Sequence, residues 1–239
     1  MDQKPPLSKR LVAEALGTAL LLAGVVGSGI MAQRLCGDNV GLALLANTLA
    51  TGGVLLCSIA ALGPISGAHF NPAVSVADAM RGGLSWLEVA AYIPSQCIGA
   101  LIGVATAHAM FGLPLLFASH HVRSGPAQWL AEFVATFGLL VVIWGCVRYK
   151  PALVPFSVAS YIVGAYWFTS STSFANPAVT LARSLSDTFA GIRPIDAPVF
   201  IIAQMLGAMS ATLLFAWLAP PDVAQARNVL LPHGETHAA

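Results

Sequence analysis

Two copies of the motif Asn-Pro-Ala are the clearest candidates for chemistry in this chain. They are Asn71-Pro72-Ala73 and Asn176-Pro177-Ala178. A polar segment precedes each motif, GPISGAH at residues 63–69 and TSSTSFA at residues 169–175. Glycine and serine allow such a segment to run extended with its carbonyl oxygens turned toward a polar solute, as hydrogen-bond acceptors. No nucleophile lies at motif spacing from a base and no phosphate-binding loop is present, so the sequence predicts no enzyme.

Each motif is expected to begin a short helix. Proline at the first helical position wastes no hydrogen bond, and the asparagine before it can cap the helix. The apolar runs, 71–80 and 176–185, are about ten residues long, which at ~1.5 Å per residue covers ~15 Å. That is half of a hydrocarbon core of ~30 Å. Two half-helices entering from opposite faces would meet near the middle of a bilayer and together act as one further span.

The rest of the chain has the composition of a membrane protein. Of its 239 residues, 57% are hydrophobic and 9% are charged, whereas soluble domains are about a quarter charged. Six runs are long and charge-poor enough to span a bilayer: 11–32, 40–61, 89–110, 129–147, 152–168 and 198–218. The first run is long for the apolar region of a signal peptide and lacks a convincing cleavage site, so it is expected to be a retained helix.

Positive charges near the spans predict the orientation. Five lysines and arginines lie on the side that the two chain ends share: Lys4, Lys9, Arg10, Arg148 and Lys150. Three lie on the other side: Arg34, Arg123 and Arg193. Because six spans bring both ends to one side, this bias predicts cytoplasmic termini in a multi-pass protein of the cell (inner) membrane.

The sequence gives little reason to expect nucleic acid, a metal or a cofactor as a partner. The net charge of +1 gives no reason to expect nucleic acid. The four cysteines, without C-x-x-C spacing, are expected to be small buried hydrophobes: Cys36, Cys57, Cys97 and Cys146. His120 and His121 lie together in a loop, where a solvated turn is favoured over a metal site. No metal and no cofactor are therefore expected.

The chain also repeats itself. LVAEALGTALLL (residues 11–22) aligns without gaps with WLAEFVATFGLL (129–140), NPAVSVAD (71–78) with NPAVTLAR (176–183), and QCIGA (96–100) with QMLGA (204–208). These anchors divide a single domain, 1–239, into repeat A at about 9–112 and repeat B at about 127–219, followed by a polar tail at 220–239. Each repeat has three spans, an odd number, so the second is inverted in the membrane, and such repeats place the solute path where the halves meet.

The repeats pair two acids, Glu14 and Glu132, inside apolar spans. Irregular backbone cannot face lipid, since each unpaired carbonyl there costs several kcal/mol, so the polar segments are expected to line water. The acids then have a plausible task, which is to accept hydrogen bonds from the N–H groups of these loops. The alternative, a proton relay, is weaker because neither acid has an obvious titrating partner in the sequence.

The doubled Asn-Pro-Ala, the SGAHFNPAV context, the Glu-bearing first helices and the Gln-x-x-Gly-Ala third helices together resemble the aquaporin and aquaglyceroporin family, the major intrinsic proteins. The resemblance covers about residues 9–218. It implies an all-α membrane fold of six transmembrane helices plus two re-entrant half-helices in an inverted 3+3 repeat, with one pore per subunit of a homotetramer. In this family, facing half-helix N-termini at the pore centre are the known means of excluding protons and cations.

The resemblance also implies roles for loop residues. Asn71 and Asn176 would donate side-chain hydrogen bonds to the solute at the pore centre. Carbonyl groups of six residues would line the two half-channels: Gly67, Ala68, His69, Thr172, Ser173 and Phe174.

The family sets its selectivity at an outer constriction of four positions. The first position lies twenty residues before Asn71, at Thr51, and the second lies twelve residues before Asn176, at Gly164. The third and fourth positions, Ser173 and Val179, flank Asn176. Water-selective members have a large aromatic, a histidine and an arginine here, and glycerol channels have two aromatics, a glycine and an arginine. The resemblance therefore implies a wide, neutral filter that lacks the usual arginine.

Arg183 lies four residues beyond Val179, about one helical turn, and so on roughly the same face. If the half-helix continues, Arg183 would lie ~5 Å nearer the outer mouth, in a basic vestibule. Pairing with Asp187 at i+4, or binding loop backbone, is preferred to direct contact with a solute. Asp78, the counterpart of Arg183 in repeat A, would lie near the inner mouth.

The predicted function is a passive channel for small polar uncharged solutes: glycerol-like polyols, metalloid hydroxides such as arsenite, and water. Similarity to bacterial relatives with an opened filter suggests the metalloids. The alternatives are a water-selective aquaporin, a gated ion carrier or proton-coupled transporter, and a non-conducting junction protein of the same fold.

Overall fold

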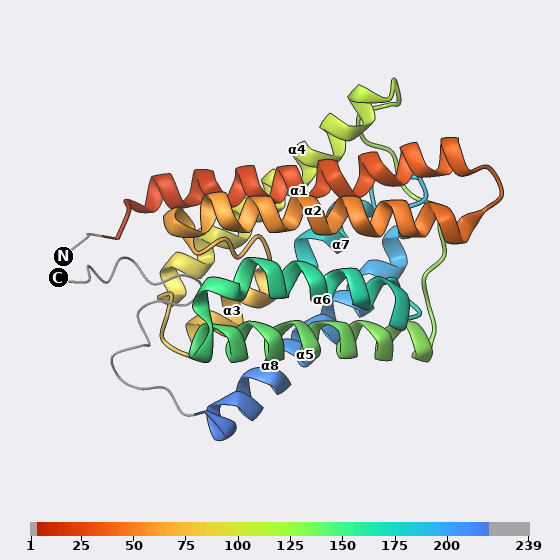
Figure 1. Ribbon diagram of the computed structural model, residues 1–239. Coiled ribbons are helices and arrows are strands. Elements are labelled where there is room, and N and C mark those ends of the chain that lie inside the picture. The colour runs from red at the N-terminus through yellow and green to blue at the C-terminus, as the bar shows by residue number, and fades with distance from the viewer. Residues whose placement is uncertain (1–3, 220–239) are drawn as a thin grey trace.

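The computed structural model describes residues 4–219 (Figure 1). It contains eight α-helices and two 3-10 turns within that range: α1 Leu7–Cys36, α2 Val40–Ser66, α3 Pro72–Met80, α4 Trp86–Met110, α5 Pro126–Tyr149, η1 Pro151–Leu153, α6 Val154–Phe168, α7 Pro177–Arg183, η2 Pro194–Asp196 and α8 Ala197–Leu218. The polar tail predicted at 220–239 lies outside the described residues.

Six of the helical segments are long and apolar enough to cross a membrane, which confirms the six predicted spans. Several of these helices extend beyond the predicted apolar runs. Helix α4, for example, begins three residues before the predicted run, since Ser85 and Glu88 form a capping box. Helix α7 is shorter than predicted: it ends at Arg183 and not at residue 185.

The two repeats build equivalent halves. Helix α1 packs against α2 and α4, and α5 packs against α6 and α8 in the same way. The half-helices α3 and α7 lie inside the bundle and contact each other, and each also contacts the other half, α3 through α8 and α7 through α4 (Figure 1). The core therefore surrounds the point at which α3 and α7 begin.

Two glycines at equivalent positions allow α4 to pack closely on α1 and α8 on α5. A Cβ atom at Gly99 on α4 would lie 2.1 Å from the carbonyl oxygen of Ala15, and one at Gly207 on α8 would lie 2.4 Å from that of Phe133. Close approach at small residues is the usual basis of helix association in lipid, where no hydrophobic force drives helices together.

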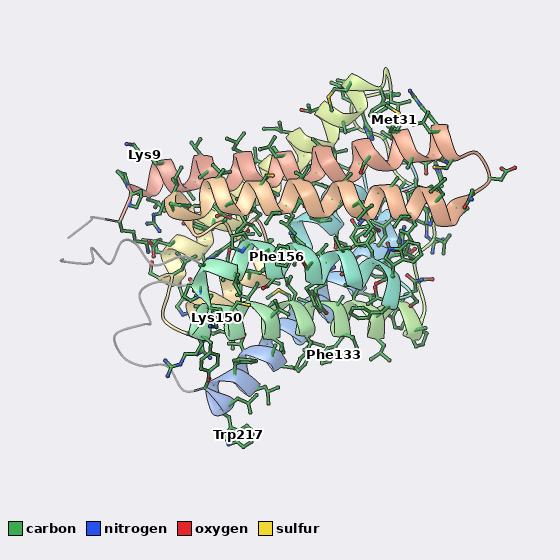
Figure 2. The ribbon with its side chains drawn as sticks, in the orientation of Figure 1. Lys9, Met31, Phe133, Lys150, Phe156 and Trp217 are labelled. Carbon is green, nitrogen blue, oxygen red and sulfur yellow. The ribbon has the colours of Figure 1, made fainter. Side chains whose placement is uncertain are left out.

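The outer surface of the bundle is apolar. Phe156 and Trp217 project outward and are 62% and 77% exposed, as expected for side chains that face lipid (Figure 2). The cysteines differ from the prediction, since none is buried in the described chain: Cys57 is exposed and the other three are half-buried. A small thiol is compatible with lipid as well as with a core.

We expect the substitutions Gly99→Ala and Gly207→Ala to destabilise the protein by about 1–3 kcal/mol each, because the new methyl group meets backbone atoms that cannot move aside. Thermal unfolding in detergent measures the effect as a lower Tm. Gly53→Ala on α2 is the matched control, since no heavy atom lies within 4 Å of a Cβ there. If both substituted proteins unfold at the Tm of the wild-type protein, these contacts do not have the role assigned to them.

Candidate functional site

The two loops that precede the half-helices share an unusual backbone. Five non-glycine residues in the described chain have positive φ, and all lie in these loops: Ala68, Phe70, Thr172, Ser173 and Ala175. Each loop then ends in an extended asparagine, with φ −155° at Asn71 and −158° at Asn176. Left-handed backbone costs free energy in residues other than glycine, so other contacts must hold these loops in place.

Those contacts come from the two buried acids. The carboxylate of Glu14 is fully buried and accepts the N–H groups of His69 at 3.0 Å and Phe70 at 2.7 Å. The carboxylate of Glu132, also fully buried, accepts those of Phe174 and Ala175, both at 2.9 Å. The hydrogen bonds expected from the sequence are therefore present in both repeats.

The repeated glutamines complete the two networks. Gln96 donates to Glu14 at 2.8 Å and to the Ser75 hydroxyl at 2.9 Å. Its equivalent, Gln204, donates to Glu132 at 2.6 Å and to the Thr180 hydroxyl at 2.8 Å. Sequence reasoning missed Ser75 and Thr180, although both occupy the fourth position after the first motif residue in the aligned segments. Each network thus ties a loop, a half-helix and two long helices together.

The two motif asparagines cross-link the loops. The Asn71 side-chain amide donates to the carbonyl of Ala175 at 2.8 Å, and that of Asn176 donates to the carbonyl of Phe70 at 2.7 Å. Their side-chain oxygens accept from the backbone of their own half-helices, at Ala73 N and Ala178 N. Because a carboxamide carries two N–H bonds, each asparagine keeps a second donor.

A cavity of about 60 Å³ runs past both asparagines. One wall is aliphatic and comes from four long helices: Leu21, Val25, Leu55, Ile59, Leu139, Ile143, Val154, Val158 and Ile162. The two loops that precede the half-helices also line the cavity, together with Asn71 and Asn176. This volume exceeds what one water needs, and the aliphatic and loop residues differ sharply in polarity.

The sequence matches the family described as Major intrinsic protein over residues 1–170 and again over residues 131–238. The chain belongs to this family. It is 56% identical to Aquaglyceroporin AqpS of Rhizobium meliloti over 219 residues, which cover 92% of this chain and 94% of that protein. It is also 31% identical to Aquaporin AqpM of Methanothermobacter marburgensis, over 89% of this chain and 98% of the other.

The fold has a solved counterpart. The X-ray structure of the aquaglyceroporin from Plasmodium falciparum matches this structure with a TM-score of 0.65 at 21% identity, over 88% of this chain and 96% of that one. The major intrinsic proteins are channels for water and small solutes and are not enzymes. The chain is therefore a multi-pass membrane channel.

Three of the four predicted filter residues line the cavity, namely Thr51, Ser173 and Val179. Gly164, the fourth, is not among the residues that line this cavity. It is exposed, and a Cβ there would meet no atom within 4 Å. Tyr166 lines the cavity in its place, with its hydroxyl 3.5 Å from that of Thr51. Because α6 continues to Phe168, residues 164 and 166 point about 200° apart, which counting back from Asn176 could not show.

The loop residues that line the cavity differ in part from the predicted set. Ala68, His69, Ser173 and Phe174 line the cavity. Gly67 and Thr172 do not. Gly67 is the cap residue that follows α2, with φ 89°, and the Thr172 N–H, at φ 61°, donates to the carbonyl of Thr169 in a turn. Phe70 and Ala175, one step nearer the motifs, line the cavity instead.

Arg183 also lines the cavity, so a cationic side chain lies on the same cavity as the neutral filter positions. Its guanidinium carbon lies 3.4 Å from the centre of the Phe174 ring, and its Nε donates to the carbonyl of Ala190. It does not pair with Asp187. The Asp187 carboxylate instead accepts from the backbone N–H and the ring of His120, at 2.8 and 2.9 Å, and these contacts lower the pKa of Asp187.

Asp78, the counterpart of Arg183 in repeat A, is 2% exposed. One of its oxygens lies 4.0 Å from the His69 ring, and the other has no hydrogen-bond partner. Equivalent positions in the two repeats thus carry opposite charges.

We expect Glu14→Gln and Glu132→Gln to lower both the Tm in detergent and the solute flux in proteoliposomes. A carboxamide replaces one acceptor oxygen with an NH₂ group, which leaves buried loop N–H groups unpaired at about 1–3 kcal/mol each. Asp38→Asn, at an exposed loop position, is the charge-matched control. If the glutamine variants behave like this control, the carboxylates do not hold the loops.

Proposed function

We propose that this protein is a passive channel for small polar uncharged solutes larger than water, such as glycerol-like polyols and metalloid hydroxides such as arsenite, and that water passes with them. The main support is the two-sided cavity at the cross-linked asparagines. The aliphatic wall suits a carbon chain, while the second N–H of Asn71 and Asn176 and the loop carbonyls suit a row of hydroxyl groups. A relative named an aquaglyceroporin, 56% identical, agrees with this preference.

The residue at position 179 supports a solute larger than water. Val179 is apolar and short, and it lines the cavity beside Ser173 and Thr51, both of which carry small hydroxyl side chains. An arginine in place of Val179 would extend several bonds further into the same space. Although Tyr166 and Arg183 also line the cavity, the small side chains at these three positions favour glycerol over a water-only channel.

We further propose that the channel lies in the inner membrane with cytoplasmic termini, and that it forms a homotetramer. One end of the bundle holds the start of α1 and the end of α8, since Lys4 contacts Glu88 and Arg81 donates to the carbonyl of Ala219. Lys9 and Lys150 lie at this end too (Figure 2). An excess of positive charge at the end that holds the start of α1 and the end of α8 supports a cytoplasmic location for this end.

Stopped-flow light scattering on proteoliposomes tests the proposed solutes. We expect the wild-type protein to raise glycerol and arsenite permeability well above that of empty liposomes, together with water permeability. Water flux without glycerol or arsenite uptake would favour the water-selective alternative. A cation current across the same membranes would favour an ion carrier.

The substitution Val179→Arg tests the width of the filter. We expect glycerol flux to fall by more than water flux, because the longer side chain reduces the width available to a three-carbon solute. Val179→Leu adds bulk without charge, so it separates the effect of side-chain size from the effect of side-chain charge. A glycerol-to-water ratio unchanged by Val179→Arg would show that position 179 does not set the solute size.

A further inference from the structure

The side chain of Arg183 is held rigidly beside the cavity. It is 2% exposed, and its guanidinium stacks on the Phe174 ring while its Nε donates to the Ala190 carbonyl. The Phe174 ring is itself fixed by an edge contact with Phe200 at 5.5 Å and by the guanidinium of Arg123 at 5.0 Å. Arg183 is therefore positioned by the surrounding protein and needs no solute to order it.

Two polar atoms at this place have no partner. Nη1 of Arg183 and the hydroxyl of Ser173 are both buried without a hydrogen bond in the described chain. Ser173 is also only 2% exposed, and both residues line the cavity. Leaving a buried cationic donor unpaired is costly, so a group that accepts a hydrogen bond from it would be bound there.

The charge around these atoms is positive. No ion pair among residues 4–219 includes Arg183. Arg123, on the same aromatic ring, gives its side-chain N–H groups to the carbonyls of Gly191 and Ser171, which carry no formal charge. The Glu132 carboxylate is occupied by the loop N–H groups and Gln204. The unpaired donors therefore favour an acceptor that carries negative charge.

We propose that Arg183 and Ser173 form a solute-binding site that takes the oxygen atoms of small oxoacid monoanions, and that Arg183 supplies from one helical turn further along α7 the cation that position 179 lacks. This inference rests on the proposed channel function, because the site lies on the path of the solute. The guanidinium Nη1 donates to one oxygen of the anion and the Ser173 hydroxyl donates to an oxygen of the same group. The oxygen atoms of neutral solutes accept hydrogen bonds from the same two donors, but these solutes bind more weakly.

Formate is the probe, and its effect on glycerol flux in wild-type proteoliposomes is the measurement. We expect sodium formate to inhibit glycerol flux competitively, whereas sodium chloride at equal osmolarity and ionic strength does not. In Arg183→Met, which keeps the length but not the charge, we expect the formate concentration for half-inhibition to rise about tenfold or more. In the double variant Val179→Arg with Arg183→Met, we expect inhibition to return, since a cation again faces the cavity.

Ser173→Ala provides a variant that leaves Arg183 and its contacts in place. Alanine already occupies the equivalent position of the other loop, Ala68, with the same φ of 49°, so this change is compatible with the backbone. We expect Ser173→Ala to weaken formate inhibition several-fold when inhibition is expressed relative to this variant's own glycerol flux without formate. Formate inhibition of wild-type strength in both Ser173→Ala and Arg183→Met would overturn the proposed site. Absence of glycerol flux in the wild-type protein would instead overturn the channel function, so the two failures are distinguishable.

Discussion

The structure depends on hydrogen bonds between two buried carboxylates and the backbone of the loops that approach the half-helices. Glu14 and Glu132 each accept two consecutive loop N–H groups and a glutamine amide. These loops contain every non-glycine residue of the described chain with positive φ. Without the carboxylates, an irregular and strained backbone at membrane depth would have no partner for its donors, and lipid supplies none. The acids are therefore structural requirements of the cavity.

A second constraint follows from the first, because loops held in this way must also be held to each other. The reciprocal bonds of Asn71 and Asn176 to the opposite loop join the two halves at the start of α3 and α7. Close packing at Gly99 and Gly207 brings the helices that carry the carboxylates next to those that carry the glutamines. The cavity is thus defined by rigid backbone on one side and by aliphatic side chains on the other.

Much of the architecture could be predicted from local patterns. The six spans follow from runs of apolar residues, and the half-helices follow from Asn-Pro starts followed by short runs. The roles of Glu14 and Glu132 could be predicted because an acid within a span needs donors, and the loops offer them. Ser75 and Thr180 were missed: the repeat places both at the fourth position after the motif asparagine, but only the structure shows the glutamines that donate to them.

The amino-acid sequence by itself determined the inverted repeat, the half-helices and the absence of an arginine at position 179, because each depends on residue type and order along the chain. Only the tertiary structure decided which side chains surround the cavity. Tyr166 lines the cavity and Gly164 does not, because α6 remains helical through both. Arg183 lines the cavity and does not pair with Asp187, because α7 ends at Arg183. Its guanidinium contacts Ala190 of the following loop and Phe174 of the preceding loop. Side-chain direction depends on where helices end and which neighbours they meet, and a count of residues contains neither.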